Sequence, residues 1–283
     1  MSGDRITLLL PLTHYHPEYL RQAVASIFAQ TRSDWRLLIV VNREDQAHFR
    51  GLLAEALSDA RVRLIHNEGR LLAGSYNTAM RAAETPFLAV LLGDDLLAAS
   101  AVEVLGQQIA THPDTDFFHT GRYFIDGNNR RLSSDYLPKG PVTRDAFIHG
   151  SPVKHMLCWR ASRGLGCGGV DESLNNFGSD DYDFPWVMLE AGAVFTAIPH
   201  CLYVMRDHRD SYRLTTHIPR SVQVRELRRI LQKHAVEPGL IRRRLWRARR
   251  HYMRQALFHN ALERWIKTRI GFDARRGWRE PFR

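Results

Sequence analysis

The sequence has few cysteines and no long hydrophobic segment. Cys158, Cys167 and Cys201 are its only cysteines in 283 residues. Three cysteines, an odd number, are too few for a disulfide framework in a chain of this length. Free thiols in a reducing cytoplasm are therefore expected. The longest apolar runs, among them Ile6–Leu10 and Phe87–Leu92, are too short to cross a bilayer or to form a signal peptide. A cytoplasmic protein that is not exported is therefore predicted.

Two further absences narrow the class of protein. No Gly-x-Gly-x-x-Gly follows the first apolar run, which disfavours a dinucleotide-binding dehydrogenase. Acidic residues are scarce from Arg220 onward, where the chain carries close to half of its lysine and arginine. The formal net charge is +10, and the concentration of positive charge near the C-terminus indicates an anionic partner: lipid headgroups, a phosphate-bearing substrate or nucleic acid.

Apolar runs alternate with helical patterns through the first part of the chain. Short apolar segments predict strands, and the segments between them repeat apolar residues at helical spacing. Strands are expected at 6–10, 37–41, 62–65, 87–92, 116–126 and 194–198, and helices at 17–30, 47–57, 72–83, 100–111 and 182–191. The glycine-rich segment 164–169 is predicted to be a loop. This order predicts an α/β fold with a mostly parallel sheet flanked by helices.

The pattern changes near Arg220, where it becomes helical, basic and amphipathic. We therefore predict two regions, an α/β domain at 1–219 and a basic helical C-terminal region at 220–283. Arginine clusters mixed with tryptophan and phenylalanine are typical of helices that lie on anionic membranes. A helix packed on the core with a solvated basic face is the alternative.

Polar residues follow the predicted strands, where an open parallel sheet binds its ligands. Pro11 and Thr13 end the first strand, Asn42 follows the second, and Asp94 and Asp95 follow the fourth. Paired carboxylates suit Mg²⁺ or Mn²⁺, which could grip a diphosphate leaving group. Capping of the next helix is the other interpretation of this acid pair.

A second acidic cluster contains Asp180 and Asp181 and opens a predicted helix. One of these carboxylates could deprotonate an acceptor hydroxyl, although capping is again possible. Farther along, Arg206 could bind phosphate and His208 could ligate a metal. An exposed arginine and a loop histidine are the plainer alternatives for these two residues.

Taken in order, these residues resemble the family 2 glycosyltransferases, which have the GT-A fold. The resemblance extends from about residue 6 to about residue 213. The segments that carry it are Pro11, Pro17–Leu20, Ala25–Thr31, Trp35–Asn42, Leu72–Asn77, Phe87–Asp95, Gly168–Leu174, Asp180–Phe184 and Leu202–His208. The sequence departs from the family pattern at Asn42 and Leu92, where the family often has acids, and at Tyr15, which stands near the family's early asparagine.

The resemblance implies an inverting, metal-dependent transfer of sugar from a nucleotide-diphosphate donor to an acceptor hydroxyl. It implies that Asp95 binds Mn²⁺ or Mg²⁺ with His208, that Asp94 lies by the sugar or ribose, and that Asp181 is the catalytic base. Donor or acceptor contacts are expected from Pro11, Thr13, Asn42, Arg70, Asp180 and Arg206. The expected acceptor is a glycan or lipid-linked glycan of bacterial surface polysaccharide synthesis.

Two other functions fit parts of the sequence. A nucleic-acid-binding protein would explain the positive charge, but that charge lies in one region and the acidic clusters would have no role. An inactive relative that only binds nucleotide-sugar would explain Leu92 and Asn42. We expect no nucleic-acid partner. We expect a cytoplasmic protein that can bind peripherally to the inner face of the cytoplasmic membrane.

Overall fold

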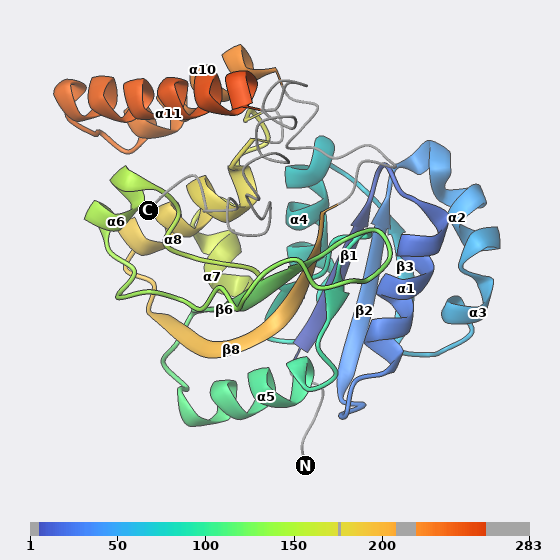
Figure 1. The fold of residues 1–283 in the computed structure, drawn as a ribbon. Helices are drawn as coiled ribbons and strands as arrows, with labels where there is room; N and C mark the ends of the chain where they lie inside the picture. The colour runs from blue at the N-terminus through green and yellow to red at the C-terminus, as the bar shows by residue number, and fades with distance from the viewer. Residues whose placement is uncertain (1–5, 175–176, 208–218, 259–283) are drawn as a thin grey trace.

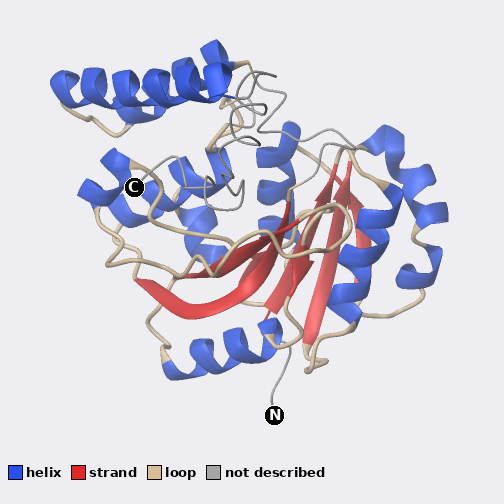
Figure 2. Ribbon diagram, in the orientation of Figure 1, coloured by secondary structure: helices blue, strands red, loops and turns tan. Residues whose placement is uncertain are grey.

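The computed structural model describes residues 6–174, 177–207 and 219–258, and side chains of the last segment as far as Arg250. One sheet of eight strands forms its centre, in the order β3-β2-β1-β4-β7-β6-β8-β5 (Figures 1 and 2). The strands are β1 (Ile6–Leu12), β2 (Trp35–Val41), β3 (Val62–His66), β4 (Phe87–Val90), β5 (Leu96–Leu97), β6 (Phe117–Ile125), β7 (Leu157–Arg160) and β8 (Phe195–Arg206). β3, β2, β1 and β4 pair in parallel, as do β6 and β8, while β7 and β5 are antiparallel to their neighbours.

Helices cover both faces of this sheet. They are α1 (Pro17–Phe28), α2 (Gln46–Leu52), α3 (Ala54–Leu57), α4 (Leu71–Ala82), α5 (Ala101–Thr111), α6 (Arg144–His149), α7 (Ala161–Gly166), α8 (Phe184–Glu190), α10 (Arg220–Lys233) and α11 (Pro238–Phe258), with a 3₁₀ turn η1 (Arg43–Asp45) and a π-helical turn η2 (Ser179–Asp183). The mostly parallel α/β architecture predicted from the sequence is confirmed. Among the described residues, no helix combines the length and apolarity needed to cross a bilayer.

Alternate residues of the central strands contribute to two separate cores. In β1, Leu8 and Leu10 join the cluster under α1 and α5, whereas Leu9 joins the cluster under α4, α7 and α8. Successive side chains of a strand point to opposite faces, so a strand covered on both sides must be apolar throughout. This explains why the strands are continuous apolar runs in the sequence.

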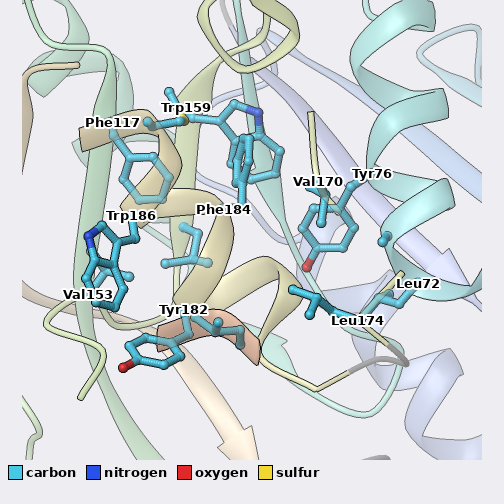
Figure 3. Packing of buried hydrophobic residues seen from close by; sticks show 14 of the residues in the cluster. Leu72, Tyr76, Phe117, Val153, Trp159, Val170, Leu174, Tyr182, Phe184 and Trp186 are labelled. Atoms are coloured by element: carbon cyan, nitrogen blue, oxygen red, sulfur yellow. The ribbon is translucent and has the colours of Figure 1, made fainter. Parts of the chain in front are cut away.

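An aromatic layer fills the second core, between α4, β7 and α8 (Figure 3). The ring of Tyr76 stacks on Trp159 with 5.6 Å between centroids, and Phe184 meets Trp159 edge-on at 5.4 Å. Tyr182 lies beside Trp186, and its hydroxyl donates a 2.7 Å hydrogen bond to the carbonyl oxygen of Phe147. This layer supports η2, the turn that contains the second acidic cluster.

The basic C-terminal helices pack on this same core. Leu227, Ile230, Leu231, Ile241 and Leu245 are all buried within it. The boundary near residue 220 remains a prediction, but the described part of the region beyond it lies against the α/β domain. α10 and the described side chains of α11 therefore pack on the core on one side and leave basic residues exposed on the other, and contact with an anionic membrane stays a prediction.

A histidine between α10 and α11 fixes them to α8. The buried ring of His234 stacks on Trp186 with 4.1 Å between centroids. Its Nδ1 lies 2.8 Å from a Glu190 carboxylate oxygen, and its Nε2 lies 3.1 Å from Asp183. Lys233 donates a 2.7 Å hydrogen bond to the other oxygen of Asp183. The C-terminal helices are thereby anchored to the last residue of η2.

The predicted loop at 164–169 was partly wrong, because α7 continues to Gly166. A Cβ on Gly164 would lie 2.7 Å from the sulfur of Met80 and 3.1 Å from rings of Phe184 and Trp159. Close packing inside a helix, not chain reversal, thus explains this glycine. Gly168 and Gly169 do lie in a loop, with φ of 91° and 76°.

Ile230→Ala should lower the free energy of unfolding by about 2–5 kcal/mol, because it removes atoms from a fully buried position. Urea denaturation followed by tryptophan fluorescence measures this loss. Arg228→Ala, on the exposed side of the same helix, should change the value by less than about 0.5 kcal/mol. Equal stability of the two variants would show that α10 does not contribute to the core.

Candidate active site

Three polar residues lie side by side where the parallel strands end. Leu12, Val41 and His66 are in register across β1, β2 and β3, so Thr13, Asn42 and Asn67 follow at the same edge. The amide of Asn67 continues the ladder with a 2.7 Å hydrogen bond to Val41. Thr13 and Asn42 are half-buried there, as the sequence predicted for the edge that binds ligands.

Pro11 and Arg70 border this edge in different ways. Pro11 is buried within β1, where it pairs with Val40 of β2. Arg70 is exposed at the N-terminus of α4, and its amide donates a 2.7 Å hydrogen bond to Glu172. Glu172 also accepts a 2.8 Å hydrogen bond from Asn77, and both of these residues line a cavity of about 420 Å³. The sequence analysis included Glu172 and Asn77 in segments that resemble the family but gave neither residue a role in the site.

Asp95 is buried and engaged with β8, whereas Asp94 is half-buried. Asp95 is only 2% exposed, and its Oδ1 accepts a 2.7 Å hydrogen bond from the amide of Arg206. Its Oδ2 accepts a 2.7 Å hydrogen bond from the hydroxyl of Tyr203, which in turn accepts one from the Leu92 amide at 3.2 Å. Burial and the Asp95 charge raise the pKa of Tyr203 well above its ordinary value. The carboxylate predicted to bind metal therefore already has a protein donor on each oxygen.

Arg206 is also buried, and its guanidinium makes four hydrogen bonds within the protein. They reach the carbonyl of Asp94 at 2.8 Å, the carbonyl of Asp126 at 3.3 Å, Gln22 at 2.8 Å and the side chain of Asn129. These hydrogen bonds hold Arg206 at the Asp94 turn, and its contact with phosphate stays a prediction.

The turn η2 presents Asp180 and Asp181 differently. Asp180 is 8% exposed and accepts a 3.1 Å hydrogen bond from the Tyr76 hydroxyl. Burial, together with the negative charge of Asp181, raises the pKa of Asp180 to about 7. Asp181 is half-buried, and burial also raises its pKa, while the positive charges of Arg122 and Lys154 act to lower it. A carboxylate in such a setting combines basicity with access.

A chain of contacts connects the two acidic clusters. The hydroxyl of Tyr203 binds Asp95, and the ring centroid of Tyr203 lies 5.3 Å from that of His155. Tyr203 also pairs with Arg122 across β8 and β6. Arg122 interacts electrostatically with both His155 and Asp181. Burial, aided by nearby positive charge, lowers the pKa of His155 to about 3, so this ring is neutral. The pairing of β6 with β8 thus puts Arg122, which acts electrostatically on Asp181, next to Tyr203, which binds Asp95.

Metal ligation by His208 cannot be placed in this arrangement, because His208 lies outside the described residues. Within the residues that the structure describes, no three His, Cys, Asp or Glu side chains gather as a metal site. The three cysteines are free, and Cys158 is buried.

The comparisons with known proteins agree with this architecture. The model of glycosyl transferase family 2 matches residues 9–163. The chain is 30% identical over 143 residues to the UDP-Glc:alpha-D-GlcNAc-diphosphoundecaprenol beta-1,3-glucosyltransferase WfgD of Escherichia coli, covering 49% of this chain and 53% of that protein. Other related sequences are matched over 16–70% of their own lengths.

Solved structures show the same fold at low sequence identity. The structure of S. aureus TarS 1–349 in complex with UDP-GlcNAc superposes with a TM-score of 0.64 at 14% identity, covering 92% of this chain and 77% of that one. The mannosyltransferase PcManGT of Pyrobaculum calidifontis, in complex with GDP-Man and Mn²⁺, gives a TM-score of 0.60 at 15% identity, covering 98% and 84%.

The raised pKa of Asp180 predicts a pH-dependent cost in stability. Its carboxyl favours folding when protonated, fully so below its ordinary pKa of 3.8, and this contribution is lost as pH rises toward 7. The free energy of unfolding of Asp180→Asn, relative to that of the parent, should therefore rise by up to about 1.4 kcal/mol per pH unit between pH 4 and 7. Above pH 7 this difference should become constant. Urea unfolding at several pH values measures the difference.

The exposed Asp114→Asn is the matched control for this measurement. The difference in free energy of unfolding between Asp114→Asn and the parent should stay nearly constant over the same pH range. If the two variants gave parallel curves, the carboxyl of Asp180 would not be perturbed by burial.

Proposed function

Because the chain belongs to glycosyl transferase family 2, we propose that it transfers a sugar from a nucleotide-diphosphate donor to an acceptor hydroxyl with inversion. One observation carries this proposal. The half-buried carboxylate of Asp181 interacts electrostatically with Arg122. Arg122 pairs across β6 and β8 with Tyr203, whose hydroxyl binds Asp95 after β4. An inverting displacement needs a base on one side of the sugar and stabilisation of the leaving diphosphate on the other.

In this proposal the donor lies over the strand ends. Thr13, Asn42 and Arg70 would contact the nucleotide, and Pro11 would shape the floor beneath it. Asn67, which the sequence analysis did not select, joins them because it lies in register with Asn42. Support comes from the position of the site at the carboxyl ends of parallel strands and from the related folds solved with UDP-GlcNAc and GDP-Man.

For the divalent cation, we exchange the roles that the resemblance gave to the two aspartates. Both oxygens of Asp95 accept hydrogen bonds from β8, whereas Asp94 is half-buried at the turn itself. Mg²⁺ and Mn²⁺ are held by one or two carboxylates together with substrate phosphates, so Asp94 fits as their protein ligand, with His208 as a second. Such a cation would neutralise charge on the diphosphate as it leaves.

Asp181 is the proposed base. It would take the proton of the acceptor hydroxyl as that oxygen attacks, and its raised pKa strengthens it for this task. Asp180 is more deeply buried and bonded to Tyr76, which suits it to hold the turn and contact substrate rather than to accept that proton.

For the acceptor, we propose a glycan or lipid-linked glycan of bacterial surface polysaccharide synthesis, modified at the cytoplasmic side of the membrane. The name of the E. coli relative specifies an acceptor sugar on diphosphoundecaprenol, which supports this class. The fold and the strand-end site do not depend on this assignment.

Asp181→Asn should reduce turnover about a hundredfold to ten-thousandfold, because an amide cannot accept the acceptor proton. Asp180→Asn, the matched variant at the adjacent position, should lose far less turnover. Release of nucleoside diphosphate measures turnover, and donor affinity by calorimetry should persist in both variants. The product should have the anomeric configuration opposite to that of the donor.

Two results would reject Asp181 as the base of a single displacement. One is retention of the donor configuration in the product, measured by NMR. The other is a larger loss in Asp180→Asn than in a nearly normal Asp181→Asn.

Excess chelator should abolish turnover, and added Mn²⁺ or Mg²⁺ should restore it. Asp94→Asn should weaken Mn²⁺ binding and lower activity by about a hundredfold, since an amide is a poorer ligand for a hard cation. Asp95→Asn should mainly lower the unfolding temperature, because it disturbs the hydrogen bonds to Tyr203 and Arg206. Metal titration and thermal unfolding of both variants separate the two roles.

Normal turnover in chelator would contradict the metal requirement. A loss of Mn²⁺ affinity confined to Asp95→Asn would restore the assignment that the resemblance suggested.

A further inference from the structure

One side of α11 concentrates positive charge around an exposed tryptophan. Ile241, Leu245 and Ala248 are buried against the core, so they define the inner side of the helix. The outer side, here called the α11 outer face, consists of Arg242, Arg243, Trp246, Arg247, Arg249 and Arg250, all exposed. Trp246 is 59% exposed, the highest fraction among the exposed large hydrophobic residues described.

The sequence of α11 contains neither aspartate nor glutamate, and Glu237, directly before the helix, acts electrostatically on Arg242 and Arg243 only at its beginning. The neighbouring α10 contains a single acid, Glu226, which is buried and paired with Arg225 and Arg229. Arg228 of α10 is also exposed. Folding accounts for the inner sides of both helices, but it does not account for a large apolar ring held in water among arginines.

We propose that the α11 outer face docks the protein on an anionic lipid bilayer. Tryptophan is favoured at the level of lipid headgroups, where its ring is apolar and its N–H stays wet. The guanidinium of Arg250 lies 5.3 Å from the centroid of the Trp246 ring. A group that can bind lipid phosphate therefore lies beside the side chain that would enter the headgroup layer. The remaining arginines add the electrostatic attraction that anionic headgroups exert on basic helices.

A nucleic-acid partner would require a different surface. Sites for single-stranded nucleic acid are positively charged grooves in which several aromatic rings stack on successive bases. The α11 outer face is the convex exterior of one helix, and Trp246 is its only aromatic residue among those whose side chains are described. Charge alone fits both partners, but this shape and the single ring favour a bilayer.

Docking through this surface would also bring the site toward the membrane. In Figure 2 the arrowheads of the parallel strands point toward the side of the molecule on which α10 and α11 lie. An acceptor carried on a membrane lipid would then approach the strand ends, a consequence that rests on the proposed function. The docking itself does not depend on sugar transfer.

Flotation of the full chain with vesicles tests the proposal. The protein should float with vesicles of phosphatidylcholine mixed with phosphatidylglycerol, should not float with phosphatidylcholine alone, and should be released at 1 M salt. A triple substitution, Arg243→Gln with Arg247→Gln and Arg250→Gln, should weaken binding about a hundredfold, since each basic residue near the surface contributes about fivefold. Replacement of the same three residues by lysine should preserve binding to within a few-fold.

Two variants distinguish this surface from net charge alone. Arg50→Gln with Arg63→Gln and Arg130→Gln removes the same charge from exposed positions on other elements and should leave flotation nearly unchanged. Trp246→Ala should weaken binding by about tenfold through lost apolar contact. Thermal unfolding checks that every variant is folded, and transfer to a soluble acceptor reports separately on the active site.

Several outcomes would overturn the proposal. Equal flotation with neutral and anionic vesicles would exclude an electrostatic surface. Equal losses in the two glutamine triple variants would exclude a role specific to α11. Polyuridine RNA that bound more tightly than anionic vesicles at equal salt, with the same sensitivity to the α11 substitutions, would assign the surface to nucleic acid instead.

Discussion

The buried carboxylate of Asp95 connects two parts of the sheet that the chain order keeps far apart. It receives hydrogen bonds from Tyr203 and from the Arg206 amide, and the Arg206 side chain returns to the carbonyl of Asp94. A buried charge is tolerated only with such complete hydrogen bonding. Because these bonds join the turn after β4 to the end of β8, they fix the turn that presents Asp94.

The second acidic cluster depends on packing rather than on charge. Tyr76, Trp159 and Phe184 form the aromatic layer beneath η2, and the Tyr76 hydroxyl reaches Asp180. π-Helical turns are uncommon and tend to occur at functional sites, where the altered turn redirects side chains. Here the rigid layer below explains how two adjacent aspartates can differ, one buried and one half-buried.

Much of the fold was predictable because continuous apolar runs and helical spacing are local signals. The parallel strands and most of the flanking helices follow from them, and so does the edge that holds Thr13, Asn42 and Asp94. Contacts between distant segments were not predictable in the same way. Nothing local distinguishes Asp94 from Asp95, or Gly164 in a helix from Gly168 in a loop, since Tyr203, Arg206 and Met80 decide these cases from elsewhere in the chain. The buried state of Arg206 likewise depends on Gln22 and Asn129.

The stacking of His234 on Trp186, with Asp183 and Glu190 on either side, has a consequence for how such enzymes diversify. The segment matched by the family model ends at residue 163, before η2 and before these helices. A chimera that exchanged only the matched segment would replace Tyr76 and Trp159 beneath η2, but it would keep the contacts of Asp183 with Lys233 and His234. One that exchanged α10 together with His234, but not α8, would place a foreign side chain against Trp186 and replace both partners of Asp183. Recombination between relatives is thus constrained to keep η2, α8, α10 and His234 together.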